Sequence, residues 1–515
     1  MKQLTGLDAA FLYMETPTTF GHVTGLMIFE RPTPDYDPYL AVYAKYAALV
    51  GELEPLRRRV VEVPFGLDRP YWVFDPNFDL DFHVRELRLA RPGLADQLAE
   101  QVCRIVGRPM DRSRPLWEVY VIDGLRDGRW ALLTKYHHAT IDGASGQLML
   151  QIVTDTTPDA PAPGKGPAWE SEALPSTAEL LRLAAGHLAL SPFRLMRLEA
   201  RIVGRIADAA GMQSVSGAAD RAGSAIKWVA RRGRGVRPSI SLPRVAAPPT
   251  PWNKTITGHR RFAMRTSSLE NIKQLKNVTG GTVNDVVMAI CAGGLREYLL
   301  AHDALPERPL RAMVPVSIRA GDEADPWTNR VSATIAELPT DCDDPVERVA
   351  RCHQAMQDAK RMHELVPAEE LVDLTQYSAP VLATAAVRLA SRLRLNERVL
   401  PFNVVISNVP GPRQPLYFAG AKLCHQFPVS IVTDGQGLNI TVVSYLDRLD
   451  FGFIADRELV PDLWDLADMH IAEIGRLFEA TGAEWAEPPR SAFPRRGQMK
   501  DILTATGKST KQPTT

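Results

Sequence analysis

Two adjacent histidines near the end of a predicted strand constrain this chain more than any other feature. His137-His138 is followed after three residues by Asp142-Gly143. The run before the pair, residues 130–135, has the apolar alternation of a strand. Apolar residues after Gly146 predict a helix that opens at residues 143–146. The histidines and the carboxylate therefore lie at a strand-to-helix junction, where rigid backbone can fix side chains for chemistry.

An imidazole at such a junction can act as a general base, because its pKa lies near neutrality. Strand alternation puts His138 on one face with Tyr136 and puts His137 on the other, so one histidine can face a reaction channel while the other is held inside the fold. Asp142 is spaced to fold back under the turn or to pair with a cation elsewhere. Gly143 is expected to allow close backbone approach or a positive φ. The alternative is a histidine buried in an ordinary core.

Length and composition limit the number of domains, the class of partner and the cellular compartment that can be expected. A chain of 515 residues exceeds one ordinary core, so two domains are expected. The formal net charge of +0 gives no reason to expect nucleic acid as a partner. Five scattered cysteines without a C-x-x-C pair favour a reducing compartment and argue against a zinc site. The sequence shows no signal peptide and no run of about 18 apolar residues, so we expect a cytoplasmic protein with peripheral membrane contact.

Strand and helix signals divide the chain into four segments. Residues 1–156 and 258–480 each mix strands with covering helices, which predicts an α/β fold with a two-layer arrangement. Asp127-Gly128 predicts a hairpin just ahead of the two histidines. Residues 157–257 begin as a proline-rich linker. Residues 481–515 are largely polar and basic, which predicts a disordered tail.

The linker segment also contains a predicted basic amphipathic helix, which starts at Ser191-Pro192. Its arginines share one narrow face, opposite its aliphatic residues, and are Arg194, Arg197, Arg201 and Arg205. Basic residues continue as far as Arg237. One interpretation is a surface helix that docks on anionic lipid. The other is an interdomain helix whose arginine face is solvated.

Six motifs in a fixed order carry a resemblance to a known family. They are Leu4-Thr5-Gly6-Leu7-Asp8-Ala9-Ala10-Phe11 with Glu15, Pro115-Leu116-Trp117, the His-His-x-x-x-Asp-Gly stretch, Asn284-Asp285, Pro315-Val316-Ser317-Ile318-Arg319 and Ser407-Asn408-Val409-Pro410-Gly411-Pro412. On these motifs the chain resembles the bacterial wax ester synthase/diacylglycerol acyltransferase family, within the CoA-dependent acyltransferases of the chloramphenicol-acetyltransferase-like fold. The resemblance runs from Leu4 to about Leu477.

The resemblance implies two chloramphenicol-acetyltransferase-like halves with a channel between them. It also implies that His138 is the general base, while His137, on the opposite face of the strand, is structural. Asp142 would then fix its loop by pairing with a cation. Arg319 is the candidate partner, because the resembling enzymes keep a cation in that region.

Other motif residues are candidates for binding the acyl thioester. The resemblance implies that Asn284 lines the channel and holds or polarises the thioester; the residues alone equally suggest that Asn284 and Asp285 cap a helix. Ser407 and Asn408 are expected in a tight turn just after a strand, and the resemblance brings that turn to the site from the second half. Asn284 or backbone amides near Gly143 are candidate donors to an oxyanion.

The resemblance implies an acyl-CoA-dependent O-acyltransferase that makes triacylglycerol from diacylglycerol at a membrane or lipid-droplet surface. A long-chain alcohol acceptor, which gives a wax ester, is the close alternative. A condensation-like transferase acting on a carrier-bound acyl group and a non-catalytic lipid-droplet surface protein are further alternatives. No serine lies in a G-x-S-x-G elbow, so we expect direct transfer from the co-substrate acyl-CoA, without a covalent acyl-enzyme, resident cofactor or metal. The oligomeric state stays open.

Overall fold

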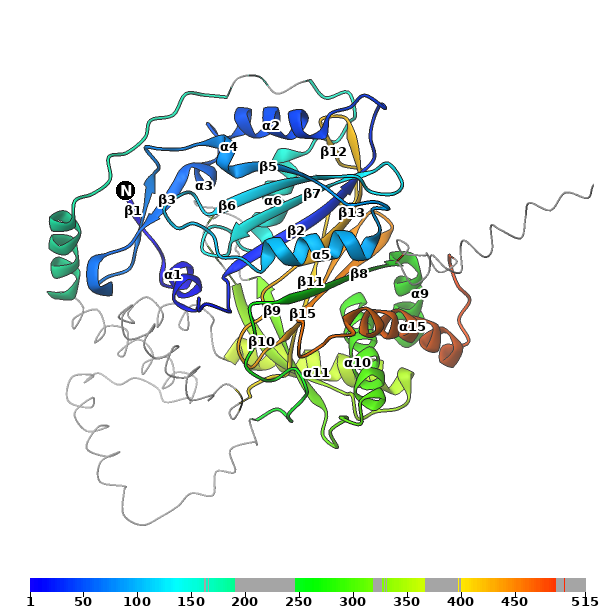
Figure 1. Ribbon diagram of the computed structural model, residues 1–515. Helices are drawn as coiled ribbons and strands as arrows, with labels where there is room; N and C mark the ends of the chain where they lie inside the picture. Colours follow the sequence, from blue (N-terminus) through cyan, green and yellow to red (C-terminus); the bar gives the residue numbers. More distant parts are fainter. Residues whose placement is uncertain are drawn as a thin grey trace, which may run out of the picture.

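Two six-stranded sheets and their covering helices build the molecule (Figure 1). The computed structural model describes residues 1–161, 164, 166–189, 246–317, 327, 329, 331–365, 397, 400–487 and 495. The predicted basic helix around residues 191–237 lies outside the described residues, as do Arg319 and nearly all of the predicted disordered tail.

The first sheet carries the two histidines and has the strand order β12-β13-β2-β7-β6-β5. Its strands are β2 (His22–Phe29), β5 (Val84–Arg88), β6 (Trp117–Asp123), β7 (Trp130–His137), β12 (Tyr417–Phe418) and β13 (Ala421–Val429). The predicted hairpin joins β6 to β7 as an antiparallel pair, with Gly128 at φ 79° in the turn. Strand β7 pairs antiparallel with β2, and this register sets His22 opposite His137.

The two faces of the first sheet bury alternate residues of the same strands, as strand geometry requires. Trp130 and Leu132 of β7 face one core, which α2 (Pro38–Leu49) and α6 (Gly143–Val153) cover. Ala131 and Leu133 face the other core, which α5 (Ala95–Val106) covers together with strands of the second sheet. Because β7 is buried on both faces, its end is fixed in position.

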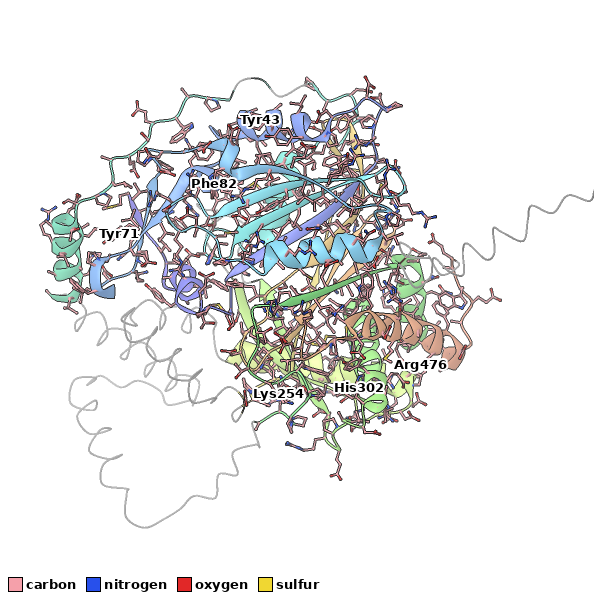
Figure 2. The ribbon with its side chains drawn as sticks, viewed as in Figure 1. Tyr43, Tyr71, Phe82, Lys254, His302 and Arg476 are labelled. Atoms are coloured by element: carbon pink, nitrogen blue, oxygen red, sulfur yellow. The ribbon has the colours of Figure 1, made fainter. Side chains whose placement is uncertain are left out.

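Shorter elements complete the first half around the end of β7. They are α1 (Gly6–Tyr13), α3 (Glu54–Arg57), η1 (Pro64–Gly66), α4 (Leu80–His83) and the three-stranded sheet of β1 (Lys2–Gln3), β4 (Tyr71–Phe74) and β3 (Arg58–Val61). Helix α1 begins after Thr5, whose side chain accepts a hydrogen bond from the Asp8 backbone N–H, as an N-cap does. The labelled Tyr71 marks this small sheet in Figure 2, and Tyr43 marks α2.

The second sheet has the order β10-β9-β11-β14-β15-β8. Its strands are β8 (Arg260–Ser268), β9 (Leu310–Ser317), β10 (Val331–Leu338), β11 (Val404–Val409), β14 (Leu438–Tyr445) and β15 (Arg448–Asp456). Its helices are α9 (Leu269–Thr279), α10 (Val283–Ala301), α11 (Pro345–Leu365) and α15 (Leu463–Thr481). Both halves are therefore α/β, as the sequence predicts.

The chain crosses between the two halves late in the sequence. Strands β12 and β13 come from the range assigned to the second half, yet β13 pairs antiparallel with β2 of the first sheet. Figure 1 shows β13, in orange, beside the blue β2, with the yellow β12 beyond it at the edge of the sheet. The expected division into 1–156 and 258–480 therefore needs one amendment, because the first sheet is completed only by residues 417–429.

No single helix in the described part of the chain is long and apolar enough to cross a membrane. The bent pair α9 and α10 passes that test together, at an angle of 98°. Most of α10 is buried in the core of the second half, where it packs with α15 and the second sheet. An apolar helix buried in this way explains the hydropathy of the pair.

Candidate active site

His138 lies directly after β7 and is held by contacts from both halves of the molecule. Its backbone N–H donates to the Gly21 carbonyl at 2.6 Å. Its ring stacks on Phe11 of α1, with ring centroids 4.1 Å apart and planes 7° from parallel. Its Nδ1 lies 3.1 Å from Oδ1 of Asn329, a residue between β9 and β10. The imidazole is therefore clamped in plane and direction.

Burial lowers the pKa of His138 below its ordinary value, since a charged imidazolium is poorly solvated there. The Asn329 hydrogen bond and the Asp142 carboxylate partly offset this effect by favouring the charged form. A lowered pKa keeps the ring neutral at physiological pH, which is the form that accepts a proton.

His137 is buried on the opposite side of the strand end. Its Nε2 lies 3.2 Å from Oε1 of Glu15, and its Nδ1 accepts a hydrogen bond from the Ala139 backbone N–H at 3.0 Å. Glu15 also accepts from the Gly21 N–H at 2.7 Å and from Arg112 at 2.7 Å. These contacts give His137 the inward, structural position that the sequence predicts.

Glu15 is ionised in this network. Burial alone would raise its pKa, but hydrogen bonds and charge from His137, with further donors from Gly21 and Arg112, outweigh burial and hold the pKa at about 2. Space is tight around the pair: a Cβ at Gly21 would lie 2.8 Å from His137 Nε2 and 2.8 Å from the Phe11 carbonyl oxygen. Glycine at 21 therefore permits the close packing behind the two histidines.

Asp142 is buried and forms the N-cap of α6. Its Oδ1 accepts from the Ser145 backbone N–H at 2.8 Å and from the Ser145 hydroxyl at 2.9 Å. Gly143 follows as the first residue of α6, and of its two expected roles the positive φ was wrong. Its φ is not positive, and an added Cβ would meet nothing within 4 Å. The Asp142 contacts hold the turn that carries His138 into α6.

Asn284 and Asp285 have separate surroundings, although they are adjacent in the sequence. Thr282, not either of them, is the N-cap of α10, and Asp285 returns a hydrogen bond to the Thr282 backbone N–H at 2.8 Å. Asp285 is buried and also lies 2.7 Å from Nδ1 of His353. Its contacts therefore explain it as a helix-capping residue, which makes a binding role for its side chain unnecessary.

Asn284 meets Asn408, which the sequence places 124 residues away: Asn408 Nδ2 donates to Asn284 Oδ1 at 3.4 Å. The expectation of a tight turn at Ser407 and Asn408 was wrong, because both belong to β11 and pair in parallel register with β14. The turn residues begin only after Val409. The sheet, rather than a loop, thus presents Asn408 to Asn284.

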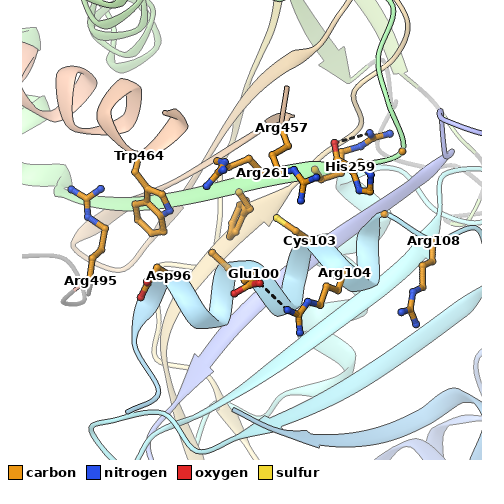
Figure 3. Close-up of a pocket in the computed structure, with 15 residues that line it drawn as sticks. Asp96, Glu100, Cys103, Arg104, Arg108, His259, Arg261, Arg457, Trp464 and Arg495 are labelled. Atoms are coloured by element: carbon orange, nitrogen blue, oxygen red, sulfur yellow. Dashed lines mark hydrogen bonds and ion pairs between the residues drawn. The ribbon is translucent and has the colours of Figure 1, made fainter. Parts of the chain in front are cut away.

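A cavity of about 1020 Å³ lies between α5 of the first half and β8 of the second (Figure 3). Its lining is rich in cations, namely Arg104, Arg108, Arg260, Arg261, Arg457 and Arg495. Of the described residues that line it, none is His138, Asn284 or Asn408. This cavity is not the expected channel, which stays a prediction.

Comparison with known proteins identifies the family. Residues 4–287 match the wax ester synthase/diacylglycerol acyltransferase catalytic domain, and residues 327–477 match the WS/DGAT C-terminal domain. The chain belongs to this family. It is therefore an acyltransferase of the WS/DGAT type, as its motifs predict.

Curated WS/DGAT relatives match nearly the whole chain. The probable diacylglycerol O-acyltransferase tgs2 of Mycobacterium tuberculosis is 34% identical and covers 92% of this chain and 98% of its own length. The O-acyltransferase WSD of Acinetobacter baylyi is 32% identical and covers 94% of this chain and 98% of its own length.

Solved structures support the same fold. The wax ester synthase/diacylglycerol acyltransferase from Marinobacter aquaeolei VT8 matches with a TM-score of 0.66 and 32% identity, over 94% of this chain and 100% of that chain. The first condensation domain of the calcium-dependent antibiotic synthetase matches with a TM-score of 0.54 and 16% identity, over 96% of this chain and 99% of that chain. At that identity the condensation domain shares the fold alone. The two-half α/β architecture is confirmed.

Three residues of this WS/DGAT site could not be predicted from the sequence. Phe11 and Asp8 stand in the first quoted motif, but nothing in their local pattern indicates that they approach His138. Asn329 stands outside every one of the six motifs, 191 residues from His138.

In the described residues there is no group of three or more His, Cys, Asp or Glu side chains that could hold a metal ion.

Proposed function

We propose that this protein transfers a fatty acyl group from acyl-CoA to the hydroxyl of diacylglycerol, with His138 as the general base. One observation carries the proposal: a histidine is held at the end of a doubly buried strand by contacts from both halves. The names of the mycobacterial relatives support diacylglycerol as acceptor.

The reaction needs one proton acceptor and one acyl carbon. His138 takes the proton of the acceptor hydroxyl while the hydroxyl oxygen bonds to the thioester carbonyl carbon. The tetrahedral intermediate then breaks its carbon–sulfur bond, and the proton on His138 passes to the departing sulfur of coenzyme A. The products are an ester and free coenzyme A, and His138 is neutral again. No covalent acyl-enzyme forms.

The oxyanion of the intermediate needs hydrogen-bond donors. Asn284 is a candidate, because its Oδ1 accepts from Asn408 and its amide nitrogen is then left to donate. Backbone amides at Gly143, where an added Cβ would meet open space, are the other candidates. Ser407 and Asn408 would act by placing Asn284 rather than by touching the carbonyl.

The acceptor reaches the enzyme from a lipid surface in this proposal, with the protein in the cytoplasm and in peripheral contact with a membrane or lipid droplet. Diacylglycerol and long-chain alcohols are water-insoluble, so the acyl transfer site must be accessible at such a surface. The basic stretch of residues 191–237, which begins with the predicted amphipathic helix after Ser191-Pro192, is the candidate contact, since clustered arginines favour anionic lipid.

Wax ester synthesis is the second candidate function, favoured by the name of the Marinobacter relative. Labelled palmitoyl-CoA offered to the purified protein with diacylglycerol and hexadecanol in competition separates the two. We expect labelled triacylglycerol as the main product, with one free coenzyme A per ester. Mainly labelled wax ester would reverse the order of the two acceptors. Absence of free coenzyme A release with either acceptor, in vesicles or micelles, would contradict the proposed function.

A further inference from the structure

We infer that Asn329 and Asp8 are positioning residues that set the tautomer of His138, so that its Nε2 is the nitrogen that accepts the proton. The inference rests on the proposed function for its use, but it concerns two residues to which the family motifs give no role. It also links the base to the packing of the two halves, because Asp8 lies in the first half and Asn329 in the second.

The first step is the hydrogen bonding of Asp8. Its Oδ1 accepts two donors from Asn329, the backbone N–H at 3.2 Å and the side-chain Nδ2 at 2.7 Å. The backbone N–H can only donate, so Oδ1 accepts from it, and an ionised Asp8 can only accept from the side-chain amide as well. Asp8 is buried and anchored in the first turn of α1. A fixed acceptor therefore faces the Asn329 amide.

The second step is the orientation of that amide. Asn329 Nδ2 donates to Asp8 Oδ1 and also to the His138 backbone carbonyl at 2.6 Å. The His138 carbonyl can only accept, so a flipped amide would set oxygen against oxygen there, and also at Asp8 when its carboxyl group is ionised. The amide oxygen must then point the other way, toward His138 Nδ1.

The third step is the tautomer. Asn329 Oδ1 can only accept, so His138 Nδ1 at 3.1 Å must carry a hydrogen and donate it. A neutral imidazole holds one such hydrogen, and Nε2 therefore has the free lone pair. Phe11 stacks on the ring and keeps it in this plane. Asp8 thus sets Asn329, and Asn329 sets His138.

Among the described residues, the charged groups near the ring act on it through their charges. Asp142 and His137 act on the pKa of His138 through their charges. Oδ1 of Asp142 accepts a hydrogen bond from Ser145. Arg58 influences Asp8 through its charge and donates to the Thr140 carbonyl at 3.4 Å. Asn329 is the described side chain that hydrogen-bonds the ring itself.

The position of Asn329 couples the base to the assembly of the molecule. Asn329 lies between β9 and β10 of the second sheet, whereas His138 directly follows β7 of the first. Separation of the halves would remove the Asn329 acceptor from Nδ1 and leave the hydrogen bond between the ring and the His138 backbone. The hydrogen bond between Asn329 and the His138 ring therefore forms only when the two halves are packed together.

A carboxylate at position 329 gives a direct test. Asp8→Asn keeps an oxygen that can accept from Asn329, and it serves as the reference protein against which the double variant is compared. In that background, Asn329→Asp puts a negative oxygen beside Nδ1–H, which raises the pKa of His138. Because the neutral ring is the base, the acid limb of kcat/KM against pH should move to higher pH by about 1 unit or more. An unmoved limb in an active double variant would overturn the inference.

A second variant covers the case in which that double variant fails to fold. Asn329→Ala should lower kcat by about 10-fold or more with little change in KM for acyl-CoA, since ring orientation rather than substrate binding is lost. Asn271→Ala is the matched control, as Asn271 is an equally buried amide that bonds the Glu487 backbone. The control should lose stability without changing the pH profile.

The tautomer can also be observed without turnover. In protein labelled with ¹⁵N-histidine, the His138 ring should show a protonated Nδ1, and Asn329→Ala should shift it toward a mixture. His138→Gln identifies the signal by its loss. A protonated Nε2 in the wild type would sink the inference while leaving acyl transfer intact. Failure of wild-type protein to release coenzyme A would instead count against the proposed function.

Discussion

At the residue scale, substitutions of the two adjacent histidines should have different effects, with activity lost mainly at His138 and stability lost mainly at His137. His138→Ala removes the proposed base and should lower acyl transfer by about 10²–10⁴-fold while the protein stays folded. His137→Ala should cost more stability than activity, because it leaves the buried Ala139 backbone N–H without its acceptor, at about 1–3 kcal/mol, and removes one of the partners of Glu15. Palmitoyl-CoA turnover and urea unfolding of both variants test this. A larger loss of activity in His137→Ala than in His138→Ala would show that His137 is the base.

Glu15 should make folding stability depend on pH. Its pKa of about 2 lies below the ordinary 4.5, so its contribution is fully present above pH 4.5 and is lost as pH falls toward 2. That shift corresponds to about 3 kcal/mol. Glu15→Gln should therefore lower the free energy of unfolding at pH 7 and narrow the difference from wild type near pH 3. Urea unfolding of wild type and Glu15→Gln at pH 7 and near pH 3 measures this difference in the free energy of unfolding.

Glu62→Gln is the matched control for this prediction. Glu62 binds the same Arg112, but its side chain is 59% exposed, and an exposed pair contributes about 0–1 kcal/mol. A loss at Glu62 as large as the loss at Glu15 would show that Arg112, rather than the buried histidine, stabilises the network.

At the element scale, α6 depends on its cap. Asp142→Ala removes the acceptor for the Ser145 N–H and hydroxyl. Loss of an N-cap costs about 0.5–2 kcal/mol, and the buried hydroxyl left behind adds to it. We expect a lower melting temperature, poor expression and reduced activity together, whereas Asp142→Asn should keep most of the stability. An Asp142→Ala protein that melts like wild type and is inactive would point to a direct catalytic role.

At the scale of the whole molecule, the two halves should unfold together. Phe427 of β13 is buried in the core that joins β2 and β7 to β8 and β15. Phe427→Ala should cost about 3–5 kcal/mol and lower hydrogen-exchange protection in both sheets equally. Phe65→Ala, at a side chain 82% exposed, should change neither. Two separate unfolding transitions, with only one shifted by Phe427→Ala, would contradict a shared core.

Much of the site's local framework could be predicted from the sequence. Strand β7, the hairpin before it and the start of α6 follow from side-chain periodicity and from Asp127-Gly128, which act over a few residues. The capping of α10 was predicted only in outline, since Thr282 outcompetes its neighbours for the cap. The strand through Ser407 and Asn408 was missed because the following Val-Pro-Gly-Pro has the composition of a turn.

By itself, the sequence determined the two α/β halves, the position of the histidine pair at a strand end and, through its motifs, the family. Only the tertiary structure decided that residues 417–429 complete the first sheet and that Asn329 holds His138 from 191 residues away. The physical reason is range. Periodicity and caps depend on neighbours along the chain, whereas the partner of a ring nitrogen depends on how two packed halves meet.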